Sequence, residues 1–308
     1  MWAVRTVFLI VLENHNWRGI EGDGLCPYIN GRMLPQASYA TRYFTPPGLH
    51  PSEPNYLWLE AGTNFGITDD ESTHRLRTSK HLVTQLDRAG ISWRSYQEGI
   101  DGTGCPQTDR GAYLAHHNPM VFFEDVYGSP DACRSHVRPF SELAGDLEHN
   151  TVARYNFITP DEFHDMHSLA TDSLSRRVQG DAWLAAEVPR ILASAAFRDD
   201  GALFVTWDEG DNSTSDGPIG LVLLSPRGRE GLRNDAQACR AHSSGVVSSH
   251  HRALLIRRRK HPTCHAYSRN GLSRFGDFRA RLAAGGCRIL HAVCKRDTGA
   301  TPFTARTE

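Results

Sequence analysis

The hydrophobic positions of this chain form short apolar runs separated by amphipathic segments. Apolar and β-branched runs predict strands at Thr6–Leu12, Ala40–Phe44, Ile91–Tyr96, Ala153–Ile158, Ala202–Trp207 and Ile219–Leu224. Helical spacing predicts helices at Ser79–Ala89 and Asp181–Ala196. Strands that alternate with helices indicate an α/β fold, with a mostly parallel sheet covered by helices on both faces.

A further helix is predicted in the segment HPSEPNYLWLEAG, starting at Ser52. Ser52 has the side chain of a good N-cap, Pro54 suits a first turn, and Gly62 suits the C-terminal stop. A hydroxyl at this point lies beside free backbone N–H groups and the positive end of the helix dipole, which favour a bound phosphoryl group. Ser52 is therefore either a cap alone or a nucleophile that the helix presents.

Acidic side chains follow two of the predicted strands. Glu13 and Asn14 come directly after the first strand, and Asp208 and Glu209 come directly after Ala202–Trp207. In such sheets ligands bind beyond the carboxyl ends of the strands. Carboxylates buried side by side need a neutralising cation, and oxygen ligands suit Mg²⁺, Ca²⁺ or Mn²⁺ without excluding Zn²⁺. The pattern predicts either a divalent-metal site or two ordinary solvated loop tips.

Histidines supply candidate groups for proton transfer. The chain contains 16 of them, and most residues in so large a set serve the surface or the core. His164, Asp165 and His167 are singled out because they follow a predicted strand end. His117 stands in an HHNP segment. Imidazole titrates near neutral pH, so these side chains are candidates for general acid–base chemistry.

Length and composition set the class of protein. With 308 residues, 39% of them hydrophobic and 22% charged, the chain can form one large α/β domain or two small ones. No run of about 18 apolar residues is present, so no membrane span is expected. The apolar run Val7–Leu12 leads into polar residues without a small-residue cleavage site, so we predict a buried strand and see no signal peptide.

The net charge of −1 conceals an asymmetry along the chain. Residues 1–226 contain 17 Lys and Arg against 30 Asp and Glu, and residues 227–308 contain 17 against 5. We predict a catalytic domain over residues 1–226, followed over residues 227–308 by a basic segment of different character or by the altered end of the same domain. Seven cysteines leave at least one unpaired. Cys105 and Cys133 either form a disulfide in an exported protein or remain free thiols.

Five motifs occur in a fixed order along the chain. They are LEN at Leu12–Asn14, HPSEPNYL at His50–Leu57, HHNP at His116–Pro119, DMH at Asp165–His167 and TWDE at Thr206–Glu209. Their order and spacing resemble the phosphoesterase family that contains bacterial acid phosphatases and phosphatidylcholine-type phospholipases C. The resemblance covers roughly residues 5–226. It implies the alkaline-phosphatase-like fold, a three-layer α/β/α sandwich.

The resemblance also implies roles for individual residues. The implied metal ligands, for a divalent ion, are Glu13, Asn14, Asp208 and Glu209. The implied catalytic residues are the nucleophile Ser52 together with His117, Asp165 and His167. The implied substrate-binding residues are Asn55, His164 and His250. The expected location, by the same resemblance, is secreted or periplasmic.

The function expected from this family is metal-dependent hydrolysis of phosphate monoesters through a phosphoserine intermediate. The substrate would be a small phosphorylated molecule such as a nucleotide, a sugar phosphate or a phosphoinositide. One alternative is a phospholipase C-like phosphodiesterase that acts on phospholipid head groups. Another is an inactive protein that binds nucleic acid or a membrane through its basic tail.

The family pattern dissolves in the C-terminal segment. Family members end with a motif like THxSxLRTIE, whereas this chain reads SSHHRALLIRRRK, in which His250 aligns with the family histidine. The segment is a basic extension, a divergent helix or an out-of-frame translation. Only the first of these makes nucleic acid an expected partner.

Overall fold

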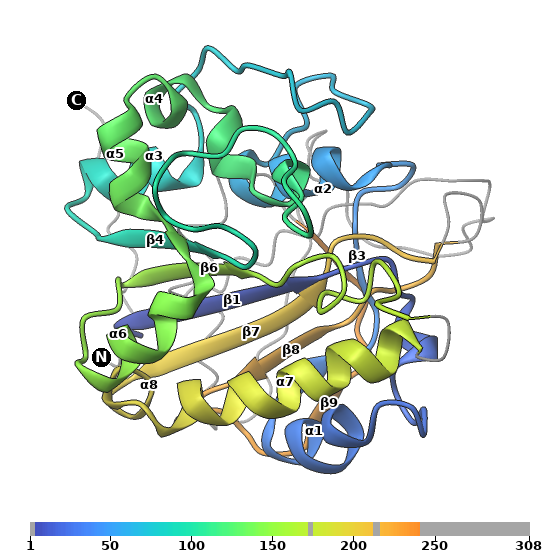
Figure 1. Cartoon of the computed structure of the whole chain (residues 1–308). Helices are drawn as coiled ribbons and strands as arrows, with labels where there is room; N and C mark the ends of the chain where they lie inside the picture. Colours follow the sequence, from blue (N-terminus) through green and yellow to red (C-terminus); the bar gives the residue numbers. More distant parts are fainter. Residues whose placement is uncertain (1–3, 172–174, 212–215, 241–308) are drawn as a thin grey trace, which may run out of the picture. The chain divides into compact units, whose positions relative to one another are not determined.

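The computed structural model describes residues 4–171, 175–211 and 216–240. Its main sheet consists of β1 (Thr6–Leu12), β2 (Ser38–Ala40), β4 (Trp93–Gln97), β5 (Val137–Pro139), β6 (Tyr155–Thr159), β7 (Gly201–Trp207), β8 (Leu221–Leu224) and β9 (Leu232–Asn234). Across the sheet the order is β5-β4-β6-β1-β7-β8-β2-β9 (Figure 1). The five strands from β5 to β7 run parallel, and β8 runs antiparallel to both of its neighbours. The expected mostly parallel sheet is therefore confirmed.

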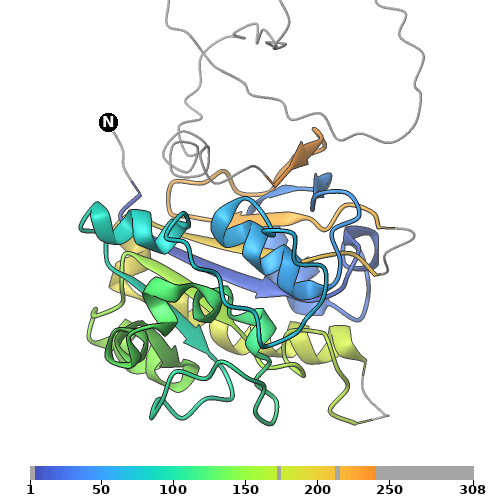
Figure 2. The same cartoon turned by 90° about the horizontal axis from the view of Figure 1, so that it is seen from above.

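Helices cover both faces of this sheet (Figures 1 and 2). One face is covered by α1 (Leu34–Gln36), α6 (Leu143–Glu148), α7 (Arg176–Ala193) and α8 (Ala195–Arg198). The other is covered by α2 (Ser52–Ala61), α3 (Leu82–Arg88), α4 (Glu124–Tyr127) and α5 (Pro130–His136). β1 serves both cores, because Phe8, Ile10 and Leu12 pack on the first face and Val11 on the second. The three-layer α/β/α architecture is thus confirmed.

Short helical turns join these elements. They lie at Trp17–Gly19, Ile29–Met33, Ala115–His117, Pro119–Phe122 and Phe140–Glu142. In the described ranges, none of the helices combines the length and the apolar character needed to cross a membrane.

The predicted strand Ala40–Phe44 is wrong as a single strand. β2 ends at Ala40, and β3 (Tyr43–Phe44) pairs with β10 (Ala238–Cys239) in a separate two-stranded sheet. The reason lies at Thr41, whose backbone N–H and hydroxyl donate to Asn234 and Asp235, so that the chain turns there.

The predicted helix Asp181–Ala196 also differs from the structure at both ends. α7 begins five residues earlier, at Arg176, and ends at Ala193. The Ser194 hydroxyl then accepts the N–H of Phe197 and starts α8, so the apolar pattern continues through a break in the backbone.

The sheet continues past the boundary expected at residue 226. β9 pairs with β2 and β10 pairs with β3, so residues 227–240 belong to the same compact unit as the preceding strands. The predicted boundary therefore falls inside this unit. His250 and the rest of the basic segment lie outside the described residues.

His81 anchors the end of α2 that lies opposite Ser52. Its Nδ1 is 2.9 Å from Glu60 Oε1 of α2, and its Nε2 is 2.8 Å from Asp125 Oδ1 of α4. Burial by itself lowers the pKa of His81, but the hydrogen bonds to Glu60 and Asp125 outweigh it, so the pKa lies above 6.5. Because a protonated imidazole donates from both nitrogens, His81 holds α2 against α4.

We predict that His81→Gln removes a pH-dependent part of the stability. A folded-state pKa above the unfolded value means that the stabilisation is complete below about pH 6.5 and is lost as the pH rises through the folded-state pKa. Thermal unfolding of both proteins from about pH 5 to about pH 9 measures this. The difference in Tm should shrink as the pH rises. A constant difference would contradict the assignment of a charged His81.

A disulfide joins Cys105 to Cys133, with the two Cα atoms 5.7 Å apart. It ties the loop that follows β4 to α5. This resolves the two possibilities left open by the sequence in favour of the bridge. Cys26 is a buried free thiol.

Removal of this disulfide should destabilise the protein. The bridge closes a loop with a sequence separation of 28, which corresponds to a loss of about 3 to 4 kcal/mol in the free energy of unfolding when both cysteines are changed to serine. Urea denaturation of the double variant and of the parent, with and without a reductant, measures this loss. The reductant should destabilise the parent more than the double variant, because Cys239 takes part in a disulfide that the variant keeps. An equal effect on both proteins would refute the prediction.

Candidate active site

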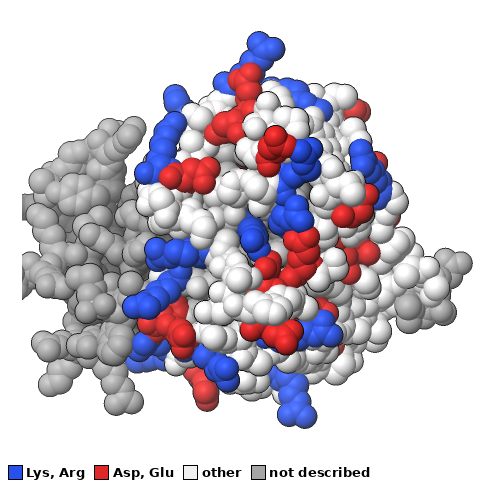
Figure 3. Space-filling view, turned by 60° about the vertical axis from the view of Figure 1, so that its left-hand side comes forward, with Lys and Arg blue, Asp and Glu red and all other residues white. Residues whose placement is uncertain are grey.

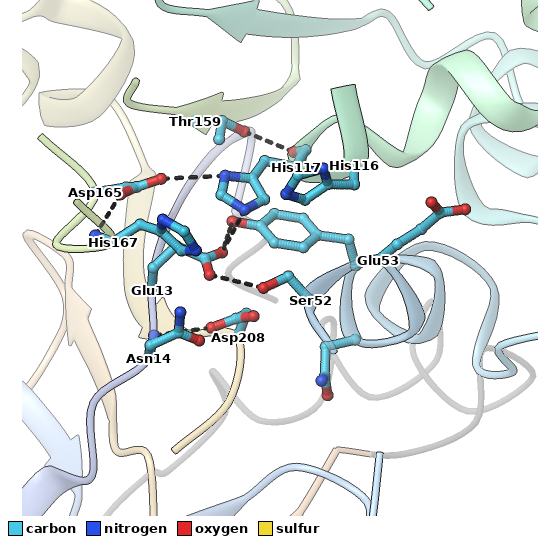
Figure 4. A network of polar contacts seen from close by, with 12 residues as sticks. Glu13, Asn14, Ser52, Glu53, His116, His117, Thr159, Asp165, His167 and Asp208 are labelled. Carbon is cyan, nitrogen blue, oxygen red and sulfur yellow. Dashed lines mark hydrogen bonds and ion pairs between the residues drawn. The ribbon is translucent and has the colours of Figure 1, made fainter. Parts of the chain in front are cut away.

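The site lies at the carboxyl ends of β1 and β7. Leu12 and Trp207 are register partners in these neighbouring parallel strands, so the residues that follow them emerge side by side. Glu13, Asp208 and Glu209 are buried there. Figure 4 shows Glu13 between two groups of side chains, with Asn14 and Asp208 on one side and His117 and Asp165 on the other.

Ser52 faces this edge from the first turn of α2. The prediction that Ser52 caps the helix is wrong, because Pro51 is the N-cap and Ser52 is the first helical residue. Its hydroxyl makes no capping bond and donates instead to Glu13 Oε2, at 2.9 Å. Gly62 ends the helix with φ at 68°, as predicted. The side chain of Ser52 is thus oriented by a carboxylate of β1.

Glu13 receives a second hydrogen bond from the same helix. The Tyr56 hydroxyl, one turn after Ser52, donates to Glu13 Oε1 at 2.6 Å. The Tyr56 ring stacks on His117, with centroids 5.1 Å apart and planes inclined by 14°. Tyr56 therefore holds both the carboxylate and the imidazole. Sequence analysis missed it, although its position four residues after Ser52 was a usable signal.

His117 and Asp165 form the second side of the site. His117 Nδ1 lies 3.1 Å from Asp165 Oδ2, and its Nε2 lies 3.4 Å from Glu13 Oε1. Asp165 Oδ1 accepts the backbone N–H of His167 at 2.7 Å, and the His167 ring lies edge-on to His117. Thr159 at the end of β6 donates to the His117 carbonyl. The structure thus brings His117, Asp165 and His167 together next to Glu13.

Asn14 adopts a left-handed backbone conformation, with φ at 48°. Its N–H donates to Asp208 Oδ1 at 3.1 Å. Asn14 Oδ1 and Asp208 Oδ2 are both buried and accept no hydrogen bond from the residues that the structure describes. A left-handed backbone conformation next to buried oxygens without hydrogen-bond partners is not explained by packing alone, and such features are typical of functional sites.

The burial of these carboxylates raises their pKa values. Burial and the charges of Asp208 and Asp165 raise the pKa of Glu13 well above its ordinary value. Burial likewise raises the pKa of Asp165 well above its ordinary value and that of Asp208 to about 6. Burial and the charge of Asp208 raise the pKa of Glu209 to about 9. The protein alone therefore does not stabilise all four negative charges at neutral pH.

The imidazoles show the opposite effect. Burial, together with His116 and His167, lowers the pKa of His117 well below 6.5. Burial also lowers the pKa of His167. Both rings are therefore neutral near neutral pH, which leaves each one a nitrogen able to accept a proton.

A divalent cation fits this donor set. The carboxylates of Glu13 and Asp208 and the amide oxygen of Asn14 are oxygen ligands of the kind that hard cations prefer. A second, overlapping set consists of Glu13, His117 and Asp165, whose ligand atoms lie within 4.8 Å of one another. Within the described residues, buried atoms without a hydrogen-bond partner occur in both sets, Asn14 Oδ1 and Asp208 Oδ2 in the first and His117 Nε2 and Asp165 Oδ2 in the second. The first set agrees with three of the four ligands implied by the resemblance.

Glu209, the fourth implied ligand, is held by other partners. Its Oε2 lies 2.9 Å from His50 Nδ1 and accepts a hydrogen bond of 2.8 Å from Asn55 Nδ2. Asn55 also donates to the carbonyls of Leu49 and Pro51, and its own oxygen accepts from Thr45. In this structure Asn55 therefore anchors Glu209, and the phosphate contact implied for Asn55 stays a prediction.

His164 lies apart from the residues around Glu13. Its Nδ1 is 3.0 Å from Glu98 Oε2 and 3.2 Å from Asp161 Oδ1. Hydrogen bonds to Asp161 and Glu98 raise the pKa of His164 to about 10. His164 thus belongs to a separate ion-paired cluster, and its implied role in substrate binding also stays a prediction.

Glu53 is a second residue that sequence reasoning missed. It follows Ser52 in α2 and is fully buried. Its Oε1 lies 2.8 Å from His74 Nδ1, and its backbone N–H donates to Asp70 Oδ1 at 2.7 Å. These contacts fasten the loop that follows α2 to the start of the helix. Nothing near Glu53 in the sequence signalled them, because both partners come from that later loop.

Comparisons with known proteins define the class of this molecule. The model of the Phosphoesterase family matches residues 36–215, which is more than half of the chain, and the chain belongs to this family. The resemblance drawn from the five motifs is thereby confirmed. Among solved structures, a protein in the alkaline phosphatase superfamily from Vibrio parahaemolyticus superposes with a TM-score of 0.54 at 8% identity, covering 77% of this chain and 64% of that chain. This likeness supports the expected fold.

Two curated relatives illustrate the family members that this chain matches. A phosphatidylinositol-3-phosphatase of Mycobacterium tuberculosis is 30% identical over 234 residues, which cover 74% of this chain and 71% of the relative. A probable acid phosphatase of Kluyveromyces lactis is 27% identical over 243 residues, which cover 76% of this chain and 55% of the relative. The chain thus spans little more than half the length of the yeast relative.

The two overlapping donor sets lead to different results on mutation. We predict that Asp208→Asn weakens the binding of Mn²⁺ at least about 10-fold, because it removes a charge from the oxygen set, and that Asp165→Asn has a smaller effect. Calorimetric titration of chelator-treated protein measures both affinities, with the Tm of each variant as the control for folding. A larger loss in Asp165→Asn would assign the cation to Glu13, His117 and Asp165 instead.

Proposed function

We propose that this protein hydrolyses phosphate monoesters in a divalent-metal-dependent reaction, as an acid phosphatase does. The observation that carries this proposal is the contact between Ser52 Oγ and Glu13 Oε2 at the start of α2. It places a hydroxyl beside buried, unpartnered oxygens in a chain of the Phosphoesterase family. Ser52 is the first residue of α2, and a helix N-terminus favours binding of the phosphate group of a substrate.

The metal ion would be held by Glu13, Asn14 and Asp208, with Glu209 behind them. When bound, such an ion lowers the pKa of a nearby hydroxyl and neutralises charge on phosphoryl oxygens. The oxygen ligands are compatible with Mg²⁺, Ca²⁺, Mn²⁺ and Zn²⁺, because all four ions accept ligands of this type.

The protein residues divide the remaining work. Ser52 attacks phosphorus, its proton passes toward Glu13, and the substrate alcohol leaves in line with the attack. From Glu13 the proton passes to the neutral His117, whose Nε2 lies 3.4 Å from Glu13 Oε1, and on to the departing alcohol, while Asp165 orients His117 and His167 lines the same side of the site. Water then hydrolyses the phosphoserine, and His117 accepts the proton of this water, which returns to Ser52 through Glu13.

The substrate class follows from the relatives and from the chain itself. Relatives named as acid phosphatases and as a phosphatidylinositol-3-phosphatase support a small phosphorylated molecule or a phosphoinositide head group. A phosphodiesterase of the phospholipase C kind is the second candidate, favoured only by the wider resemblance of the motifs. On the face shown in Figure 3, the described acidic and basic side chains are interspersed, which gives little support to a nucleic acid partner on that face.

We also propose that the protein acts in an oxidising compartment, secreted or periplasmic. The disulfide between Cys105 and Cys133 supports this, since such bonds persist mainly outside the reducing cytosol.

Ser52→Ala should abolish turnover while the protein stays folded. The side chain contributes one hydrogen bond to Glu13 and no cap, so the Tm should change little, whereas loss of a nucleophile lowers kcat by at least about 1,000-fold. Hydrolysis of p-nitrophenyl phosphate, with and without a chelator and then with added Mn²⁺, measures the loss.

A parallel assay on a choline phosphodiester separates the two enzymatic candidates. Faster turnover of the diester would favour the phospholipase C alternative. A folded Ser52→Ala variant with full activity would refute the nucleophile, and activity that survives chelation would refute the metal requirement.

A further inference from the structure

Arg240 lies buried between the two elements that carry the proposed nucleophile and metal ligand. Its Nη2 donates to the carbonyl of Trp207 at 2.9 Å, and its Nη1 donates to the carbonyl of Asn55 at 3.3 Å. Arg240 is only 5% exposed. A single guanidinium therefore joins the last residue of β7 to the first turns of α2.

Both accepting carbonyls are close to the reacting groups in the sequence. Trp207 directly precedes Asp208, and Asn55 follows Ser52 by three residues in α2. A shift of either carbonyl moves the neighbouring functional side chain with it, because both segments are regular secondary structure. The bridge thus links the two elements that carry the site, and its hydrogen bonds go to their backbone carbonyls rather than to the Ser52 hydroxyl.

Arg240 is itself held in place by the backbone. β10 pairs with β3, and the next N–H along the chain, that of Arg240, donates to the carbonyl of Phe44 at 3.0 Å. The side chain carries a guanidinium group whose Nε has no hydrogen-bond partner within the described residues. Such a side chain is costly to bury, which argues for a role beyond filling space.

We propose that Arg240 is a positioning residue of the active site, which fixes Ser52 on α2 relative to Asp208 after β7. The inference rests on the proposed phosphatase function. The planar guanidinium reaches two carbonyls in a fixed fork, whereas the single ammonium of a lysine lacks that geometry. The segment after residue 226, which composition set apart, thereby contributes to the arrangement of the site.

The test compares Arg240→Ala and Arg240→Lys with Arg233→Ala. Arg233 is a matched control, since it lies in β9 of the same segment but is half exposed and pairs at the surface with Glu21 and Asp235. We expect Arg240→Ala to lose about 100-fold in kcat on p-nitrophenyl phosphate, as small misplacements of reacting groups do. KM should change less than about 3-fold, because the side chain does not touch the substrate.

The two replacements separate geometry from charge. Arg240→Lys keeps the charge and should remain at least about 10-fold slower than the parent. Millimolar guanidinium ion should restore part of the activity of Arg240→Ala, whereas ammonium ion should not. Parental kcat in Arg240→Lys, or equal rescue by both ions, would overturn the proposal.

Two further readouts keep the test decisive. If Arg240→Ala is unfolded at the assay temperature, the kcat of Arg240→Lys decides alone. If the parent itself shows no turnover, the proposed function fails, and the rise in Tm on adding Mn²⁺ tests Arg240 independently. That rise should be smaller in both Arg240 variants than in Arg233→Ala, and equal rises in all three would refute the positioning role.

Discussion

The burial of carboxylates at one edge of the sheet is the constraint on which the rest of this structure depends. Glu13, Asp165 and Asp208 are all 0% exposed, and each ionised carboxylate in such surroundings costs several kcal/mol unless it is compensated. Ser52 and Tyr56 each donate one hydrogen bond to Glu13, which offsets part of this cost. The remainder requires bound protons or a cation, and the divalent cation proposed for this site would leave the carboxylates charged.

The same constraint explains why α2 is fixed by distant residues rather than by its own sequence. Near its start, the helix is held by Glu13 of β1 and by Arg240, and near its end by the pair Glu60 and His81. The proposed nucleophile would have to keep its position to about a fraction of an ångström relative to the proposed metal ligands, and a short helix with a free end does not provide that rigidity. Contacts at both ends supply it.

Sequence reasoning predicted the parts of this arrangement that depend on local pattern. β1 was predicted to the residue, because an apolar run ends sharply at Glu13, and the parallel fold then requires Glu13 and Asp208 to share an edge. The failures arose where a distant side chain decides between two local options. Ser52 suits a cap and a first helical residue equally well, and Glu13, 39 residues away, determines the choice. His164 also has a distant partner, Glu98, which is 66 residues away in the sequence, and its implied role in substrate binding stays a prediction.

The charge composition of the C-terminal segment averages over residues with different physical roles. β9 is an edge strand and carries one exposed charged side chain, Arg233, of the kind that edge strands commonly use, so a basic residue there is compatible with the same domain. Arg233 is of this exposed kind, whereas Arg240 is buried and bonds to two backbone carbonyls behind the site. A net-charge count treats the two alike. β9 pairs with β2, β10 pairs with β3, and Arg240 bonds to the backbone of β7 and α2, so this part of the basic segment contributes to the same fold as the acidic residues before it.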